Sequence, residues 1–354
     1  MPLFKPGDLR QVGYVLFEAA GCPPEDAKAV ADHLVESHLF GHDSHGAIRY
    51  YEYAKAIREG RFKPGQKPEI LKEGPAYAVI DAHQTLGQVG ATFATRLAIR
   101  KAKQTGIATV TLRNTSHIGR VGAYPLMAAR EGMVGQIFVN AGHLGYQIAP
   151  FGGIDGRLST DPIAFAAPRR DGEPLMVDMT TSVVAEGKIR VAMNRGEHVP
   201  EGWIIGPDGK PSTDPMAFKG DPPGAMLPLG GATSGHKGFG MAMMVEFLAG
   251  AMGGQGCASG ERTMMSNGVL LNVYDIDTFM DREQYLDEVE GLIRHVKSSR
   301  PAEGFSEVLI PGEPEFRTAE RKNRDGIEVD DRTWEQVCDE ARLVGLDPAK
   351  WKVG

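Results

Sequence analysis

The sequence lacks several features that would assign it quickly to a class. Basic residues are not in excess, because 39 lysines and arginines face 46 aspartates and glutamates, a formal net charge of −7. Without a basic cluster that could follow a phosphate backbone, we expect no nucleic-acid partner. The three cysteines, Cys22, Cys257 and Cys338, are widely spaced and show no ligand-like pairing, which is typical of a reducing compartment.

Long apolar runs are also missing. No stretch approaches the roughly 18 apolar residues that a membrane span needs, and the first residues lack the basic and apolar regions of a secretory signal. We therefore expect a cytoplasmic protein without a membrane partner. With 354 residues and 42% hydrophobic content, the chain is long enough for about two globular domains.

The usual dinucleotide fingerprint, Gly-x-Gly-x-x-Gly directly after a strand, is absent as well. Gly238-Phe239-Gly240 lacks the third glycine and lies within a helical pattern. The glycine-rich segment 230–238 leads into that helix and carries Lys237, so it could bind an anion, but it lacks Walker A spacing. Any nucleotide must therefore be held by another scaffold, and an NTPase is disfavoured.

Hydrophobic periodicity predicts alternating helices and strands framed by helical ends. Two helices are expected within 8–37, and further helices over 44–58, 87–103, 121–131, 183–194, 238–250, 281–298, 314–324 and 331–344. The helix over 238–250 is expected to be buried. Strands are expected over 78–81, 107–112, 134–139, 162–167, 175–177, 268–273 and 308–310, and an ordered surface excursion over 196–233.

The densest chemistry lies in the octapeptide from His42 to Arg49. If a helix begins near Ser44, His45 and Arg49 project from one face, one turn apart. A guanidinium can hold a carboxylate through two hydrogen bonds, and an imidazole can exchange a proton near neutral pH, so the pair suits a small oxo acid. The structural alternative is a helix cap at Ser44, a dipole partner at Asp43 and a solvated charge at Arg49.

A second candidate is His117, in the segment 114–119 between a predicted strand and a predicted helix. It could be a second acid/base or a substrate contact, or it could merely cap the following helix. No metal site is expected, because His42, His45, His117 and His236 show no familiar ligand spacing.

Six ordered motifs together resemble those of the malate/L-lactate dehydrogenase family that is distinct from the Rossmann-type enzymes. That family includes ureidoglycolate dehydrogenase, sulfolactate dehydrogenase, diketogulonate reductase and Δ1-piperideine-2-carboxylate reductase. The resemblance covers nearly the whole chain. Its motifs are Asp43-Ser44-His45-Gly46 with Arg49, and the segments 114–119, 161–164, 178–182, 235–240 and 311–314.

The resemblance implies an α/β fold of the α+β kind, a non-Rossmann NAD(P)-binding fold with a largely antiparallel sheet plus a helical N- and C-terminal domain. The helical, substrate and dimer domain would comprise 1–70, 118–160 and 300–354, and the NAD(P)-binding domain 71–117 and 161–299. The implied protein is a homodimer that transfers hydride between NAD(P)H and C2 of a small 2-oxo or 2-hydroxy acid, with NAD and NADP not distinguished.

Two alternatives to keto-acid reduction stay open at this point. One is reduction of cyclic 2-imino acids such as Δ1-piperideine- or pyrroline-2-carboxylate, or imine reduction that forms N-methyl amino acids. The other is a nucleotide-binding regulator that has lost the chemistry.

The resemblance also implies roles for individual residues. His45 would be the proton donor or acceptor with Ser44 and Asp178 as relay partners, Arg49 would hold the substrate carboxylate, and His117 would be the rival for His45. Cofactor contacts would come from Asn140, Asp178, Met179, Thr180, His236, Lys237, Gly312, Glu313 and Pro314. Two positions depart from the family pattern: Asp161, where relatives commonly carry asparagine, and His236, where they often carry an aromatic residue.

Overall fold

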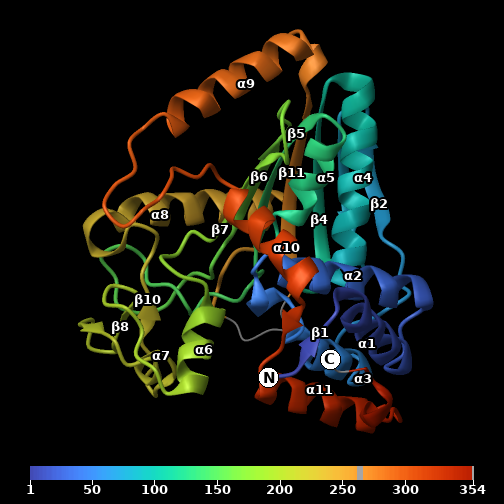
Figure 1. The fold of residues 1–354 in the computed structure, drawn as a ribbon, viewed down its shortest axis with the longest axis vertical. Coiled ribbons are helices and arrows are strands. Elements are labelled where there is room, and N and C mark those ends of the chain that lie inside the picture. The colour runs from blue at the N-terminus through green and yellow to red at the C-terminus, as the bar shows by residue number, and fades with distance from the viewer. Residues whose placement is uncertain (261–265, 353–354) are drawn as a thin grey trace.

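A seven-stranded sheet forms the centre of the computed structural model, which describes residues 1–260 and 266–352 (Figure 1). The strand order is β2-β3-β4-β11-β5-β6-β7. The strands are β2 (Glu69–Gly74), β3 (Tyr77–Asp81), β4 (Ile107–Thr115), β5 (Met133–Asn140), β6 (Ile163–Ala167), β7 (Leu175–Met179) and β11 (Asn267–Asp275). Among these strands only β3 and β4 pair in parallel, so the expectation of a largely antiparallel sheet is confirmed.

The parallel pair β3–β4 is joined by helix α4 (Gly87–Thr105), which packs on the sheet beside α5 (Ala123–Arg130). Alanines dominate the buried face of α4, and they let the helix lie close to the apolar side chains of β4 and β11. The first residue of α4 has no room for a side chain, because a Cβ on Gly87 would lie 2.2 Å from the carbonyl oxygen of His117. The start of α4 thereby fixes the loop that follows β4.

The two ends of the chain form a helical layer that lies below the sheet in Figure 1, except for α10 (Glu313–Asp325), which runs beside the lower part of the sheet. It contains α1 (Pro6–Ala19), α2 (Pro24–Leu39), α3 (Arg49–Arg58), α10 and α11 (Asp331–Leu343), with the short pair β1 (Leu3–Phe4) and β12 (Ile327–Glu328). N-terminal Leu16 and Leu34 share one apolar core with C-terminal Val337 and Ala341. The helices nearest the two ends of the chain are therefore packed together.

The expected excursion over 196–233 is ordered and has its own small core. Helix α6 (Glu186–Arg195) leads into it, and β8 (Ile204–Ile205), β9 (Pro211–Ser212), α7 (Met216–Lys219) and β10 (Ala225–Met226) lie within it. Ile189 of α6 is buried with Ile204 and Met226. This unit leaves the sheet after β7 and returns through α8 (Gly231–Val245), which continues as the π-helix η2 (Glu246–Met252).

Three predicted elements differ from the structure: two helices are wrong in part, and one strand is absent. The helix expected from Ser44 begins at Arg49, and residues Asp43–His45 form a separate 3-10 turn, η1. Gly46 interrupts the helix with a ψ of −139°, and a Cβ there would lie 2.7 Å from Nδ1 of His38. His45 and Arg49 are therefore not on one helix face, and periodicity did not show this because it ignores such tertiary contacts.

The other two errors concern the C-terminal half. The strand expected over 308–310 does not form, because the amide of Ile310 donates to the Glu313 carboxylate at 3.0 Å instead of to a neighbouring strand. The helix expected over 238–250 begins seven residues earlier and is not buried throughout, since Met244 and Phe247 are 40% and 60% exposed. Helix α9 (Arg282–Lys297) matches its prediction. In the described ranges no helix is long and apolar enough to cross a membrane.

Candidate active site

Two histidines from distant parts of the chain meet beside the sheet. His45 ends η1, and His117 lies in the loop that follows β4. Their rings stack with centroids 5.4 Å apart and planes 16° apart. The tertiary structure thus brings together the two sequence candidates for acid/base chemistry. Because like charges repel at this spacing, the pair can hold at most one proton easily.

His117 is oriented by Tyr53 from α3. The tyrosine hydroxyl lies 2.5 Å from Nδ1 of His117 and accepts from the Gln88 side chain at 3.4 Å. Burial raises the pKa of Tyr53 to about 12, so the hydroxyl keeps its proton and donates it to the ring. Neutral His117 then carries its own proton on Nε2, the nitrogen away from Tyr53.

Arg49 is hydrogen-bonded to η1, the segment that carries His45. Its Nε donates to the carbonyl oxygen of Ser44 at 2.8 Å, and its Nη1 pairs with Oε2 of Glu52. Ser44 Oγ in turn lies 3.1 Å from Nδ1 of His45. Arg49, Ser44 and His45 are therefore assembled as expected, although by a hydrogen bond to the backbone of η1 and not by helical spacing.

Helix α6, which precedes the excursion, covers this cluster. A Cβ on Gly187 would lie 2.6 Å from Cβ of Ser44, so only glycine lets the first turn of α6 rest on η1. One turn later Arg190 reaches Oε1 of Glu52 at 3.0 Å. Glu52 thus joins two guanidinium groups. Burial alone would raise the pKa of Glu52, but Arg49 and Arg190 hold it below its ordinary value.

The electrostatics of the histidine pair differ from the simple expectation of a group that titrates near neutral pH. Burial lowers the pKa of His45 well below its usual range, and His117 and Arg49 lower it further. The pKa of His117 is lowered in the same way by burial and then by Arg49. Both rings are therefore neutral at pH 7.

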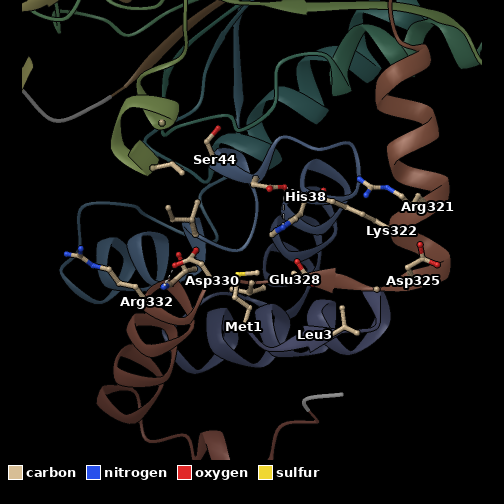
Figure 2. A pocket seen from close by; sticks show the side chains of 17 residues that line it. Met1, Leu3, His38, Ser44, Arg321, Lys322, Asp325, Glu328, Asp330 and Arg332 are labelled. Atoms are coloured by element: carbon tan, nitrogen blue, oxygen red, sulfur yellow. Dashed lines mark hydrogen bonds and ion pairs between the residues drawn. The ribbon is translucent and has the colours of Figure 1, made fainter. Parts of the chain in front are cut away.

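Asp43 and Ser44 of η1 also border a cavity of about 590 Å³, shown in Figure 2. Lys322 of α10 donates to Oδ1 of Asp43 at 2.7 Å and to the carbonyl oxygen of His38 at 2.8 Å. Nε2 of His38 lies 3.3 Å from the same Asp43 oxygen. These contacts join η1 to α2 and α10. They thereby restrict the position of His45, the last residue of η1.

The other expected site residues form a second group around the end of β7. Asp178 accepts from the amide of Gly122 at 2.8 Å and raises the pKa of nearby His42, which burial lowers overall. Met179 ends β7, and the hydroxyl of Thr180 donates to the carbonyl oxygen of Ser182 at 3.1 Å. The structure shows no hydrogen bond between Asp178 and Ser44 or His45 within the described residues.

The segment Gly312, Glu313 and Pro314 lies next to β7, because the amide of Met176 donates to the carbonyl oxygen of Pro311 at 3.2 Å. Gly312 has a φ of +96° and begins α10, and Glu313 pairs with Lys297 at 2.6 Å. His236 and Lys237 lie in α8, not before it, and both are exposed. The aromatic ring of Phe151 packs edge-on against His236.

Asn140 is buried and its side chain is fully engaged. Its amide nitrogen donates to Glu246 and to the carbonyl oxygen of Gly256, and its oxygen accepts from the amide of Gly268 at 3.2 Å. Its own carbonyl accepts from Asn267, whose Oδ1 accepts from the amide of Ile118 at 3.0 Å. Asn140 therefore supports the His117 loop from the neighbouring strand.

Four residues at this site escaped the sequence analysis: Glu52, Tyr53, Gln88 and Arg190. Tyr53 could have been found from its spacing, because it lies four residues after Arg49 on the same helix. Nothing in the sequence places Gln88 or Arg190 near them, since both come from other elements.

Comparisons with known proteins agree with this architecture. Residues 4–338 match the family model described as malate/L-lactate dehydrogenase. The chain is 40% identical over 335 residues to the malate dehydrogenase of Pyrococcus horikoshii, covering 92% of this chain and 91% of that protein. It is also similar to the solved structure of sulfolactate dehydrogenase from Methanocaldococcus jannaschii, with a TM-score of 0.86 and 36% identity over 99% of both chains.

A third similar protein is named for a different activity. The crystal structure of Δ1-piperideine-2-carboxylate reductase from Pseudomonas syringae pvar. tomato superposes with a TM-score of 0.83 and 28% identity, over 96% of this chain and all of that chain. The fold and the sequence agree along almost the full length. The chain therefore belongs to the malate/L-lactate dehydrogenase family, whose members are dehydrogenases that act on the CH–OH group of 2-hydroxy acids.

Proposed function

We propose that this protein interconverts a small 2-oxo acid and its 2-hydroxy acid with NAD(P)H or NAD(P)+ as the redox partner. The single observation that carries the proposal is the stacked pair His45 and His117 beside Arg49. A guanidinium fits the carboxylate at C1, and an imidazole fits the oxygen at C2, one bond away. The sequence relatives named as malate and sulfolactate dehydrogenases support the same class of substrate.

The family implies a nicotinamide cofactor, and the residues present fit one. Lys237 is exposed on α8 and has no carboxylate partner among the described residues, which suits a phosphate. Nε2 of His42 is buried without a hydrogen-bond partner in the described structure, next to Asp178 at the end of β7. When bound, the nicotinamide supplies or accepts the hydride at C2.

The contacts that we assign to the cofactor are the segment Asp178, Met179 and Thr180, the pair His236 and Lys237, and the turn Gly312, Glu313 and Pro314. Asn140, fully engaged inside the protein, would act by holding the His117 loop. The choice between NAD and NADP is part of the test below.

The proton step follows from the electrostatics of the histidine pair. Burial is the main cause of the low histidine pKa values, and the charge of Arg49 lowers them further. A substrate carboxylate on Arg49 offsets this second contribution, so substrate binding favours uptake of one proton by the pair. We assign that proton to His45, with Ser44 hydrogen-bonded to Nδ1 of His45, and assign His117 to holding the substrate oxygen through Nε2. Asp178 would take part in the relay only through His42.

The direct test is an oxidation screen of NADH and NADPH with 2-oxo acids of graded length. We expect turnover with at least one short 2-oxo acid and a preference for one cofactor. The absence of turnover with every acid and both cofactors, in a protein that binds cofactor, would contradict the proposal and favour a nucleotide-binding regulator.

The assignment of the proton carrier can be tested with His45→Gln and His117→Gln. Positioned proton transfer is worth about 10²–10⁴-fold in rate. We expect His45→Gln to lower kcat by that amount and to abolish its pH dependence, whereas His117→Gln should mainly raise KM. The reverse pattern would exchange the two roles.

A second candidate function is reduction of cyclic 2-imino acids, favoured by the similarity to Δ1-piperideine-2-carboxylate reductase. An imine and an oxo acid share the carboxylate and the reacting C2, so Arg49 and His45 would serve both. Pyruvate with and without methylamine separates them, because an imine reductase needs the amine.

We further propose that the protein forms a homodimer. Support comes from large apolar side chains that remain exposed along α8 and η2, namely Met244, Phe247 and Met252, at 40–60% exposure. Exposed apolar patches of this kind often mark protein interfaces. Light scattering coupled to gel filtration should give about twice the chain mass of 38.2 kDa, and a monomer at micromolar concentration would contradict this.

A further inference from the structure

We propose that Arg190 is a specificity-determining residue that binds a second anionic group of the substrate, so that the site prefers 2-oxo and 2-hydroxy acids with two negative charges. The proposal rests on the function proposed above and names the substrate class for the same site. The second group would be a carboxylate or a sulfonate one or two carbons beyond C2.

The first argument is a charge imbalance around Glu52. Its Oε2 pairs with Arg49 and its Oε1 with Arg190 at 3.0 Å, so one carboxylate faces two guanidinium groups. All three side chains are largely shielded, with exposed fractions of 16%, 26% and 23% for Arg49, Arg190 and Glu52. A shielded cluster with one excess positive charge favours binding of an anion.

The second argument concerns the unused donors of Arg190. Its Nε and Nη2 are buried and have no hydrogen-bond partner within the described structure. Buried donors are nearly always satisfied in native proteins, and leaving them unpaired is costly. A salt bridge that merely joined α6 to α3 would need only Nη1 of Arg190. The two unpaired nitrogens therefore indicate that an acceptor, such as a substrate anion, is missing.

The third argument is position. Gly187 sets the first turn of α6 against Ser44, and Arg190, three residues later, projects from the same side of the helix. Arg190 therefore reaches the cluster from α6, whereas Arg49 reaches it from α3. Because Glu52 binds both guanidinium groups, they lie near one another, and Arg49 is held next to His45 by the carbonyl oxygen of Ser44. This arrangement suits the two ends of a short dianion.

The chemistry then divides substrates by charge. With a monoanionic acid, Arg49 is neutralised and the idle nitrogens of Arg190 stay unpaired. With a dianionic acid, both guanidinium groups receive a carboxylate or sulfonate partner in addition to Glu52. The preference is expected to be about tenfold to a hundredfold, the value of one charge-assisted hydrogen bond.

The experiment compares oxaloacetate with pyruvate in the wild-type enzyme, Arg190→Met and Arg190→Lys. We expect the ratio of kcat/KM for oxaloacetate over pyruvate to fall at least tenfold in Arg190→Met and to be partly kept in Arg190→Lys. Lys188→Met is the matched control, because Lys188 is exposed on the same helix, and its ratio should equal that of wild type. Arg190→Gln replaces Arg190→Met if the latter does not fold.

A ratio within twofold of wild type in the neutral variants would overturn the proposal, and so would equal losses with both substrates, which indicate a structural salt bridge only. Binding provides a readout that does not need turnover. Calorimetry should show tighter binding of L-malate than of L-lactate in wild type and loss of that difference in Arg190→Met. If no 2-oxo acid is reduced, the proposed function fails, and these binding ratios still decide the role of Arg190.

Discussion

Replacing Asp161 by asparagine should stabilise this protein, by an amount that grows with pH. Asp161 is fully buried in the loop that leads into β6, and the hydroxyl of Ser159 donates to its Oδ1. Its Oδ2 has no partner among the described residues, and neither has Oε1 of Glu246, which is 2% exposed and within hydrogen-bonding reach. Two facing acceptors are satisfied only if one proton lies between them.

The pKa shifts of Asp161 and Glu246 also indicate a shared proton. Burial raises the pKa of Asp161 well above its ordinary value, and the charge of Glu246 raises it further. Burial also raises the pKa of Glu246, although Ala258 and Asn140 donate to its Oε2 at 2.9 and 3.2 Å. The two groups titrate as a pair that retains one proton in the folded state.

The sign of the pH effect follows from this retained proton. A carboxyl whose pKa is higher in the folded state binds more protons when folded, so its contribution to stability is complete below about pH 4, its unfolded pKa, and is lost as pH rises. For one proton the loss is at most about 1.4 kcal/mol per pH unit. Asparagine removes this dependence, because its amide can donate permanently to Glu246.

The expected gain at pH 8 is about 1–3 kcal/mol, the cost of a buried polar group without a good partner. For a chain of this length that corresponds to an increase of roughly 1–4 °C in Tm. Backbone conformation does not oppose the change, because Asp161 has a φ of +33° and both asparagine and aspartate tolerate the left-handed region.

Thermal unfolding of wild type and Asp161→Asn at pH 5, 6.5 and 8 measures the effect. The matched control is Glu288→Gln, which changes an exposed carboxylate on α9 and should shift Tm equally at all three values. A variant that is less stable than wild type at pH 8, or whose advantage does not grow from pH 5 to pH 8, would refute the shared proton.

Two further substitutions test the positioning of the active site. Tyr53→Phe removes the hydroxyl that lies 2.5 Å from Nδ1 of His117. We expect about a tenfold loss of kcat/KM and a shifted pH profile of activity, with Tm little changed. An unaltered pH profile would show that Tyr53 does not act at the site. Gly187→Ala places a Cβ 2.6 Å from that of Ser44, so steady-state assays should show a large loss of kcat/KM. Gly291→Ala on α9, whose Cβ would make only an ordinary contact 3.9 Å from the Arg294 side chain, should keep activity and gain up to about 1 kcal/mol of stability.

Much of the fold could be predicted because it depends on local patterns. The helices α1, α2, α4 and α9 and the strands β5 and β6 lie close to their predicted ranges, since their apolar spacing is regular over many residues. Short elements such as β8 and β10 were not predicted. Their two-residue ladders exist only because the excursion folds over its own core, which periodicity cannot show.

The candidate site, like the fold, could be predicted from the sequence only in part. The residue types in the octapeptide from His42 to Arg49 were enough to indicate carboxylate binding and proton transfer, because guanidinium and imidazole groups are intrinsically suited to them. The sequence also identified His117, but only as a rival to His45, the preferred proton carrier. Its place against His45 depends on contacts between η1 and the β4 loop.

The sequence by itself determined the reactive groups, the helical ends and the absence of a glycine-rich dinucleotide loop, since these follow from residue type and spacing. Only the tertiary structure decided which groups act together. Glu52 joins Arg49 to Arg190 across 138 residues, and Tyr53 reaches His117 across 64. Both pairings are set by how α3, α6 and the sheet pack, and the burial that lowers the pKa of His45 has the same origin, because desolvation depends on every neighbouring chain segment.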